Sequence, residues 1–266
     1  MPLKRIFLLI LLAALLTLPG CLNGPQPNTQ PPTEPAPTLP QSPFSPGDFT
    51  EDKGFLSCAG VNAVVGIDVS HHQQQIDWQQ VADAGVKFAM IRLGRRGLTT
   101  GALAADDLAA VNLAGAREAG LKIGAYFYSQ AVSPEEAAAE AAFALQILDG
   151  TPLDLPLVYD WELEDRTAGV DQKTLTACTR TFCEAVEAAG YTAMIYFNSY
   201  QALELLDLLQ LTAYPWWLAM YDHTQNFPCR MDMWQYTNTG SVPGIQGNVD
   251  VNLLFPDTFF TEVFSP

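Results

Sequence analysis

The chain has 266 residues, of which 29 are acidic and 13 basic, and its formal charge at neutral pH is −16. Binding of nucleic acid rests on a basic surface, so nucleic acid is excluded as an expected partner. Residues 54–266 are long enough for one sizeable domain and fall within the range typical of α/β barrels.

The N-terminus has the layout of a secretory signal. Lys4 and Arg5 precede an apolar run over residues 6–16, which is too short to cross a membrane as a helix. We expect residues 1–20 to be a signal peptide that is removed from the mature protein. Its removal would leave 11 basic and 29 acidic residues.

A cysteine follows this signal directly. Leu18, Gly20 and Cys21 resemble the lipobox of bacterial lipoproteins, in which the cysteine is lipidated and becomes the mature N-terminus. The resemblance implies a lipid anchor on Cys21 and a protein held outside the cytoplasmic membrane, facing the cell wall. A soluble secreted protein, cleaved nearby, is the alternative.

Residues 21–53 form the next region, the lipidated cysteine and a proline-rich tether. From residue 22 to about residue 48 the chain is dense in Pro, Gln, Thr and Ser, and it has too few large apolar side chains to build a core. At about 3.1 Å per residue, some 30 extended residues would span roughly 90 Å. A protein that begins near Gly54 should therefore keep its stability.

Helical and strand-like segments alternate after the tether. Gly85, Gly120 and Gly190 each follow a helical stretch and precede an apolar one, as expected for a residue that ends a helix in the left-handed conformation. Asp77 and Ser133 have the sequence context of helix N-caps. Apolar strands that alternate with helices favour a parallel sheet covered by helices.

The last three expected strands lie too close together for a full helix between them. A regular eightfold barrel is therefore not expected, and the predicted fold class is α/β, an irregular TIM-like β/α barrel in which β/α units come first and near-consecutive strands close it. Active sites of such barrels gather at the carboxyl ends of the strands. The expected strands are residues 63–69, 87–93, 121–128, 155–162, 192–197, 214–221, 231–236 and 247–252.

Two acids end the fourth expected strand. Asp160 and Glu162 follow an apolar run and are two residues apart, so their side chains should emerge on the same face of the strand. Hydrolysis of a glycosidic bond needs such a pair, with one carboxyl protonated to donate to the leaving oxygen and the other ionised to stabilise positive charge. The plainer interpretation is a strand that ends in two solvated acids.

Further acids, aromatic rings and amides fall at other expected strand ends. Asp68 ends the first strand and Asp250 lies in the last. Aromatic rings can pack on the apolar faces of sugars, while amides bond to hydroxyl and acetamido groups, although each ring taken singly is more often part of a core. The candidate substrate-binding residues are Tyr126, Tyr196, Trp217, Tyr221, Trp234 and Gln235.

Taken in order, these motifs resemble family 25 of the glycoside hydrolases, the 1,4-β-N-acetylmuramidases or lysozymes. The resemblance covers residues 63–254, and it implies an irregular β/α barrel with three late strands. The motifs that carry it are residues 66–70 (Gly-Ile-Asp-Val-Ser), 124–126 (Gly-Ala-Tyr), 160–162 (Asp-Trp-Glu), 217–221, 234–236 (Trp-Gln-Tyr) and 249–252 (Val-Asp-Val-Asn).

The same resemblance implies a substrate and residue roles. The substrate would be peptidoglycan, cut between N-acetylmuramic acid and N-acetylglucosamine. Glu162 would be the general acid, Asp160 would position the acetamido group or stabilise the oxocarbenium-like transition state, and Asp68 and Asp250 would complete the acidic cluster. A carboxylate nucleophile and assistance by the substrate's acetamido oxygen both stay open. The chain departs from many relatives at residues 95–96 and 127–128.

No cofactor or metal is expected. The three histidines and the cysteines lack the spacing of a zinc site. Cys58, Cys178, Cys183 and Cys229 could form up to two disulfides, whose pairing the sequence leaves open. We expect a monomer whose partners are peptidoglycan strands and, through the lipid, the membrane. The alternatives are an inactive wall-binding lipoprotein and a solute-binding lipoprotein.

Overall fold

The computed structural model describes residues 38–52, 54–221, 225–256 and 259–264, which belong to one compact unit, Pro37–Pro266. The predicted signal peptide, Cys21 and the tether up to residue 37 lie outside the described residues. Among the residues described, no helix is both long and apolar enough to cross a membrane.

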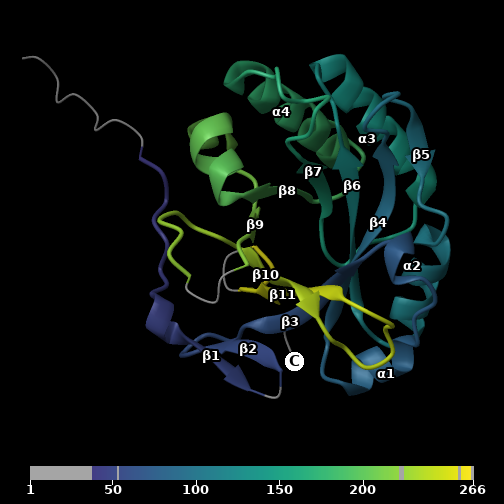
Figure 1. The fold of residues 1–266 in the computed structure, drawn as a ribbon, viewed down its shortest axis with the longest axis vertical. Coiled ribbons are helices and arrows are strands. Elements are labelled where there is room, and N and C mark those ends of the chain that lie inside the picture. Colours follow the sequence, from purple (N-terminus) through teal and green to yellow (C-terminus); the bar gives the residue numbers. More distant parts are fainter. Residues whose placement is uncertain (1–37, 53, 222–224, 257–258, 265–266) are drawn as a thin grey trace, which may run out of the picture. The chain divides into compact units, whose positions relative to one another are not determined.

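Eight strands close into a barrel (Figure 1). The neighbours run in the order β3, β11, β10, β9, β8, β7, β6, β4, and pairing of β3 with β4 completes the ring. All adjacent pairs are parallel except those of β11, which runs antiparallel to β10 and to β3. The predicted irregular barrel is confirmed. Its strands are β3 (Val64–Val69), β4 (Phe88–Arg96), β6 (Lys122–Ser129), β7 (Leu157–Trp161), β8 (Ala193–Asn198), β9 (Trp216–Ala219), β10 (Met233–Gly240) and β11 (Val249–Leu254).

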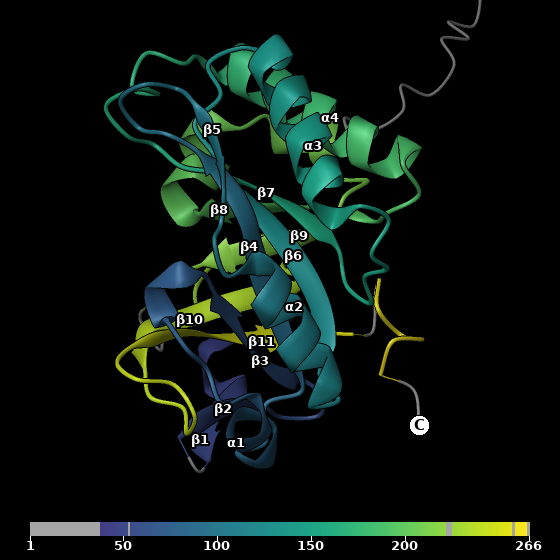
Figure 2. The same cartoon turned by 90° about the vertical axis from the view of Figure 1, so that its right-hand side faces the viewer.

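In the part of the chain that the structure describes, four α-helices cover the outside of the parallel part of the barrel, and α2 and α3 face the viewer in Figure 2. Asp77 and Ser133 cap α1 and α3 as predicted, each accepting a bond from a backbone N–H three residues on. Gly85, Gly120 and Gly190 have φ angles of 104°, 81° and 87°, which confirms the predicted helix ends. The helices are α1 (Trp78–Asp83), α2 (Ala109–Glu118), α3 (Pro134–Leu148) and α4 (Gln172–Ala188).

The barrel interior is packed with large side chains below the strand ends. Gly66 and Gly124 make room for them, because a Cβ at these positions would lie 2.3 Å from the ring of Phe88 and 2.6 Å from Met90. Phe260 and Phe264 pack against this cluster near the amino-terminal ends of the parallel strands. Side chains thus fill the interior at that end of the barrel.

The segment before residue 54 corrects one prediction. We expected the tether to reach residue 53, yet β1 (Phe49–Asp52) pairs antiparallel with β2 (Phe55–Cys58). Phe44 packs on Phe255 with ring centroids 4.4 Å apart, and Phe49 packs on Trp234 at 5.0 Å. The domain therefore begins well before Gly54. Two phenylalanines are enough to attach this segment to the domain, because they cover apolar side chains on the outside of the barrel.

The four cysteines in the part of the chain that the structure describes are unpaired. Cys58, Cys178, Cys183 and Cys229 are buried free thiols. Cys178 and Cys183 lie on α4, and burial raises the pKa of both thiols, that of Cys178 to about 12. These thiols therefore behave as small core side chains.

A short strand that was not predicted, β5 (Leu103–Ala105), extends the sheet beyond β4.

Candidate active site

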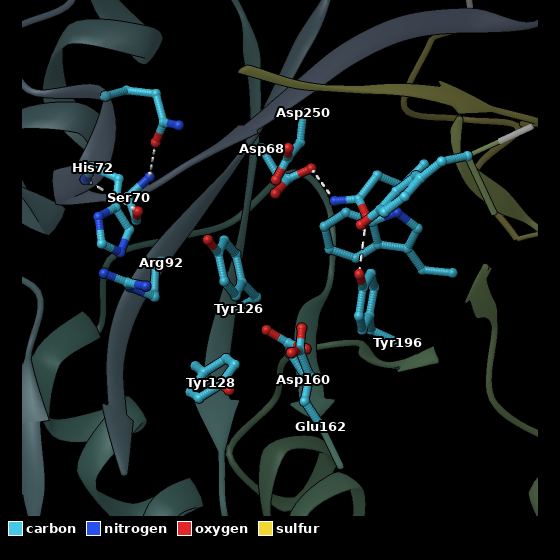
Figure 3. Close-up of a pocket in the computed structure, with 14 residues that line it drawn as sticks. Asp68, Ser70, His72, Arg92, Tyr126, Tyr128, Asp160, Glu162, Tyr196 and Asp250 are labelled. Atoms are coloured by element: carbon cyan, nitrogen blue, oxygen red, sulfur yellow. Dashed lines mark hydrogen bonds between the residues drawn. The ribbon is translucent and has the colours of Figure 1, made fainter. Parts of the chain in front are cut away.

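A pocket opens at the carboxyl ends of the parallel strands (Figure 3). The four acids predicted from the sequence all line it, together with five of the six predicted substrate-binding residues. The lining residues are Asp68, Ser70, His72, Gln73, Arg92, Tyr126, Tyr128, Asp160, Glu162, Tyr196, Trp217, Tyr221, Gln235 and Asp250.

The first pair of acids is Asp68 on β3 and Asp250 on β11, which lie opposite one another in the antiparallel register. Oδ2 of Asp68 accepts hydrogen bonds from Gln235 Nε2 and Asn252 Nδ2, both at 2.8 Å. Burial raises the pKa of both acids; these bonds oppose the rise at Asp68, whereas the charge of Asp68 adds to it at Asp250. The two amide bonds therefore favour the charged form of Asp68, whereas the neighbouring charge disfavours ionisation of Asp250.

The two amides are oriented by aromatic side chains. The hydroxyls of Tyr196 and Tyr221 each donate to Oε1 of Gln235 at 2.9 Å, and Nε1 of Trp217 donates to Oδ1 of Asn252 at 2.8 Å. With their oxygens occupied in this way, both amides turn their N–H groups toward the carboxylate on β3. The aromatic side chains thus act on the site through the amides as well as by lining it.

The second pair is Asp160, at the end of β7, and Glu162, just beyond it. Burial, followed by the charges of Glu162 and Asp68, raises the pKa of Asp160 well above its usual value. Burial, followed by the charges of Glu164 and Asp68, also raises the pKa of Glu162, while a hydrogen bond from Tyr128 opposes the rise. Oδ1 of Asp160 is buried and has no hydrogen-bond partner among the described residues.

The backbone beneath Glu162 is held from three sides. Its carbonyl accepts from Gln130 Nε2 at 2.9 Å and from Thr167 Oγ1 at 3.0 Å. The carbonyl of Trp161 accepts from Gln201 Nε2 at 2.9 Å. These bonds fix the position of the Glu162 backbone and so limit where its side chain can lie. A catalytic group needs support of this kind.

The arrangement combines Glu162, a carboxyl whose pKa is raised, with Asp68, a carboxyl whose charged form is favoured by two amide donors. That combination suits acid-assisted cleavage of a bond to oxygen, in which a proton goes to the leaving group and negative charge stabilises the positive centre left behind. The described residues hold no group of three or more His, Cys, Asp or Glu side chains arranged to bind a metal.

Comparison with known proteins assigns this site to a family. Residues 67–245 match the family described as glycosyl hydrolases family 25, and the match includes three of the four acids. The chain belongs to family 25 of the glycosyl hydrolases. It is therefore a glycosidase, and the expected α/β barrel is the fold of its solved relatives.

Several proteins resemble this family 25 chain along most of the domain. A protein of Escherichia coli O157:H7 named YegX, whose function is uncharacterised, is 34% identical over 198 residues, which are 71% of this chain and 68% of that protein. Lysozyme M1 of Streptomyces globisporus is 28% identical over 222 residues, covering 76% and 71%. The modular autolysin LytC of Streptococcus pneumoniae, solved with a synthetic peptidoglycan ligand, has 26% identity and a TM-score of 0.62; the match covers 72% of this chain but only 46% of LytC.

One predicted binding residue of this family 25 domain lies outside the pocket. Trp234 is a residue of β10, and its side chain is fully buried on the outer face of that strand. Its Nε1 donates to the carbonyl of Met220 at 2.8 Å, and its ring packs on Phe49. Successive residues on a strand point to opposite faces, so the neighbour of an inward-facing Gln235 has to face outward. The prediction took both residues from one motif and overlooked this alternation.

The sequence analysis missed five residues that line the pocket. Ser70, His72 and Gln73 lie within five residues after Asp68. Their position just beyond the end of a strand could have indicated that they line the site. Arg92 interrupts the apolar run of β4, and Tyr128 lies two residues after Tyr126, on the same face of β6. A charge within a buried strand of this barrel was the clearest of these signals.

Proposed function

We propose that this family 25 glycosidase is a lysozyme that hydrolyses the β-1,4 bond between N-acetylmuramic acid and N-acetylglucosamine in peptidoglycan. The observation that carries the proposal is the convergence of four carboxyls in one pocket, with two of them on a single strand end and with pKa values raised by burial. The similarity to Lysozyme M1, and to an autolysin solved with a peptidoglycan ligand, supports this substrate.

In the proposed reaction Glu162 donates its proton to the leaving glycosidic oxygen. It lines the pocket, and burial and nearby charges raise its pKa, which favours the protonated form that a general acid needs. Asp160 lies beside it with an unpartnered buried oxygen, which suits acceptance of the N–H of the sugar's acetamido group. The carboxylate of Asp68, held by two amides, stabilises the positive charge that develops on the sugar ring.

The test is to replace Glu162 by Gln. This change removes the transferable proton at nearly unchanged shape, and a general acid contributes roughly 10²- to 10⁴-fold to rate. We expect turnover of purified peptidoglycan to fall by that factor while circular dichroism stays unchanged. For the wild type, mass spectrometry of the products should find muramic acid at the new reducing ends.

Glu118→Gln, at an exposed position on α2, is the matched control and should keep full turnover. If Glu162→Gln keeps near wild-type turnover, the proton donor lies elsewhere. If the wild type binds walls without releasing fragments, the protein is the inactive wall-binding lipoprotein considered as an alternative. A solute-binding role is disfavoured because such proteins usually have two lobes, whereas the described residues build a single closed barrel.

We also propose that the enzyme works outside the cytoplasm, attached to the membrane through a lipid on Cys21. The support comes from the sequence: the short apolar run of residues 6–16 and the small residue Gly20 directly before the cysteine. A tether between the lipid and the barrel would let the active site reach glycan strands in the wall.

A further inference from the structure

A second cavity, of about 320 Å³, adjoins the catalytic pocket. His72, Arg92 and Tyr128 line both, so the two spaces are continuous on the side of the site that carries His72 and Arg92 in Figure 3. No acid is among the described residues that line this second cavity. We call it the basic pocket; its lining residues are His71, His72, Arg92, Arg95, Leu98 and Tyr128.

A buried carboxylate holds one wall of the basic pocket in place. Oδ2 of Asp106 accepts from Arg92 Nε at 2.9 Å and from the backbone N–H of His71 at 3.0 Å. Although burial alone would raise it, the pKa of Asp106 is lowered by the bonds from His71 and Leu108 and by the charge of Arg92. Arg92 is therefore oriented by an ionised partner that also neutralises most of its charge.

Arg95 differs from its neighbours in having no such partner. Its side chain is exposed and makes no hydrogen bond or salt bridge with another residue in the described part of the chain, whereas Arg96 is buried against Glu140 at 2.6 Å. A shift in the β4–β6 register between Arg92 and Gly94 lets Arg95 line the same cavity as Arg92 despite their odd spacing. Arg95 thus supplies an unpaired positive charge in the cavity that adjoins the catalytic pocket.

The imidazole of His72 adds little positive charge of its own. Burial lowers the pKa of His72, and the nearby charges of His71, Arg92 and Arg95 lower it further, with Asp106 opposing them. The arginines therefore give the basic pocket a positive charge that does not depend on protonation of His72. In a chain with a formal charge of −16, a free guanidinium beside the catalytic acids marks a place where an anion is favoured.

We propose that the basic pocket is a subsite for a carboxylate of the substrate's muramoyl unit, with Arg95 as its counter-ion. The inference rests on the proposed lysozyme function. Muramic acid carries a lactyl group on O3, which ends in a carboxylate when free and continues into a stem peptide with carboxylates of its own when substituted. The carboxylate of Asp68 in the catalytic pocket would repel an acidic substrate, and the Arg95 guanidinium offsets that repulsion at the adjoining cavity.

The experiment compares soluble glycan strands that differ only in their carboxylates. One set keeps the stem peptides, and a second has lost them to an amidase, which frees the lactyl carboxylate. Half of each set is coupled to ammonia with a carbodiimide, which converts carboxylates to neutral amides. We expect Arg95→Gln to lower kcat/KM roughly tenfold on the carboxylate forms and to leave kcat/KM on the amidated forms unchanged.

Two further variants sharpen the result. Arg95→Lys keeps the charge and should recover part of the loss, and Arg180→Gln, which removes an exposed arginine from α4, should change kcat/KM on none of the substrates. A loss confined to strands with stem peptides identifies a peptide carboxylate, and a loss confined to stripped strands identifies the lactyl carboxylate.

If Arg95→Gln lowers kcat/KM equally on carboxylate and amidated strands, or on neither, the subsite is refuted while lysozyme activity stands. If the wild type releases no fragments from any of the four substrates, the proposed function fails, and this inference fails with it.

Discussion

At the scale of single residues, burial governs the protonation of the active-site acids. Asp160 is 5% exposed and has the carboxyls of Glu162 and Asp68 nearby, so its charged form is disfavoured both by lost solvation and by repulsion. The proposed reaction needs these carboxyls close together, whereas their mutual repulsion and burial destabilise the folded protein. The site should therefore be a point at which the protein gives up stability for function.

We predict that Asp160→Asn stabilises the protein at neutral pH while lowering its turnover. The folded-state pKa of Asp160 is raised, so its contribution to stability is fully present below the unfolded pKa of about 3.9 and is lost as the pH rises through the folded pKa. Asn cannot ionise and escapes that loss. Each kcal/mol regained raises Tm by about 2–4 °C.

The measurement is Tm by calorimetry at pH 7.5 and at about pH 4, where the advantage of the variant should vanish. Asp165→Asn removes an exposed acid from the loop after β7 and should leave Tm unchanged at both pH values. A variant that is less stable than the wild type at pH 7.5 would show that Asp160 is not a destabilising charge.

At the scale of elements, the segment before residue 54 is part of the domain. Phe44 and Phe49 are each half-buried against Phe255 and Trp234, and the β1–β2 hairpin adds backbone bonds. Trp234 is the neighbour of Gln235, which donates to Asp68. The segment thus supports the outer face of a strand whose inner face carries the active site.

We predict that a protein that begins at Gly54 is less stable than one that begins at residue 38. Losing the cover of two half-buried phenylalanines should lower the free energy of unfolding by about 2–4 kcal/mol and Tm by roughly 5–15 °C. Phe49→Ala in the longer protein should produce part of this loss, and Thr50→Ala, at an exposed position of β1, should produce little. Equal Tm values for the two lengths would show that residues 38–53 do not stabilise the domain and belong to the tether.

At the scale of the whole molecule, the domain boundary changes the reach of the proposed anchor. With residues 38–52 in the domain, about 16 residues are left between Cys21 and the barrel, which span roughly 50 Å if extended. The enzyme would then act on wall material within that distance of the membrane. Cleavage far from the cell surface would require release of the lipid.

We predict that Cys21→Ser releases the protein from the membrane fraction, because a serine cannot receive the thioether-linked lipid. Immunoblotting of membrane and soluble fractions is the measurement, and Cys58→Ser, which changes a buried thiol in the domain, is the control and should stay membrane-bound. Retention of Cys21→Ser in the membrane would overturn the anchor.

The strands and the acid pair were predictable because they depend on local patterns. Apolar runs of five to eight residues mark β3, β6, β7 and β8 to within two residues. The placement of Asp160 and Glu162 follows from the same reasoning, since strand geometry alone puts side chains two residues apart on one face. The hairpin of β1 and β2 could not be predicted this way, because its few apolar side chains are buried only by distant partners.

The sequence by itself thus determined the irregular barrel and the four acids, since both rest on periodicity and on residues at strand ends. Only the tertiary structure decided that Asp250 faces Asp68, that Trp234 faces away from the site, and that Arg95 lines the adjoining cavity. Pairing register, strand alternation and a local bulge set these outcomes. Each depends on which strands become neighbours, and that is a property of the closed barrel rather than of any single segment.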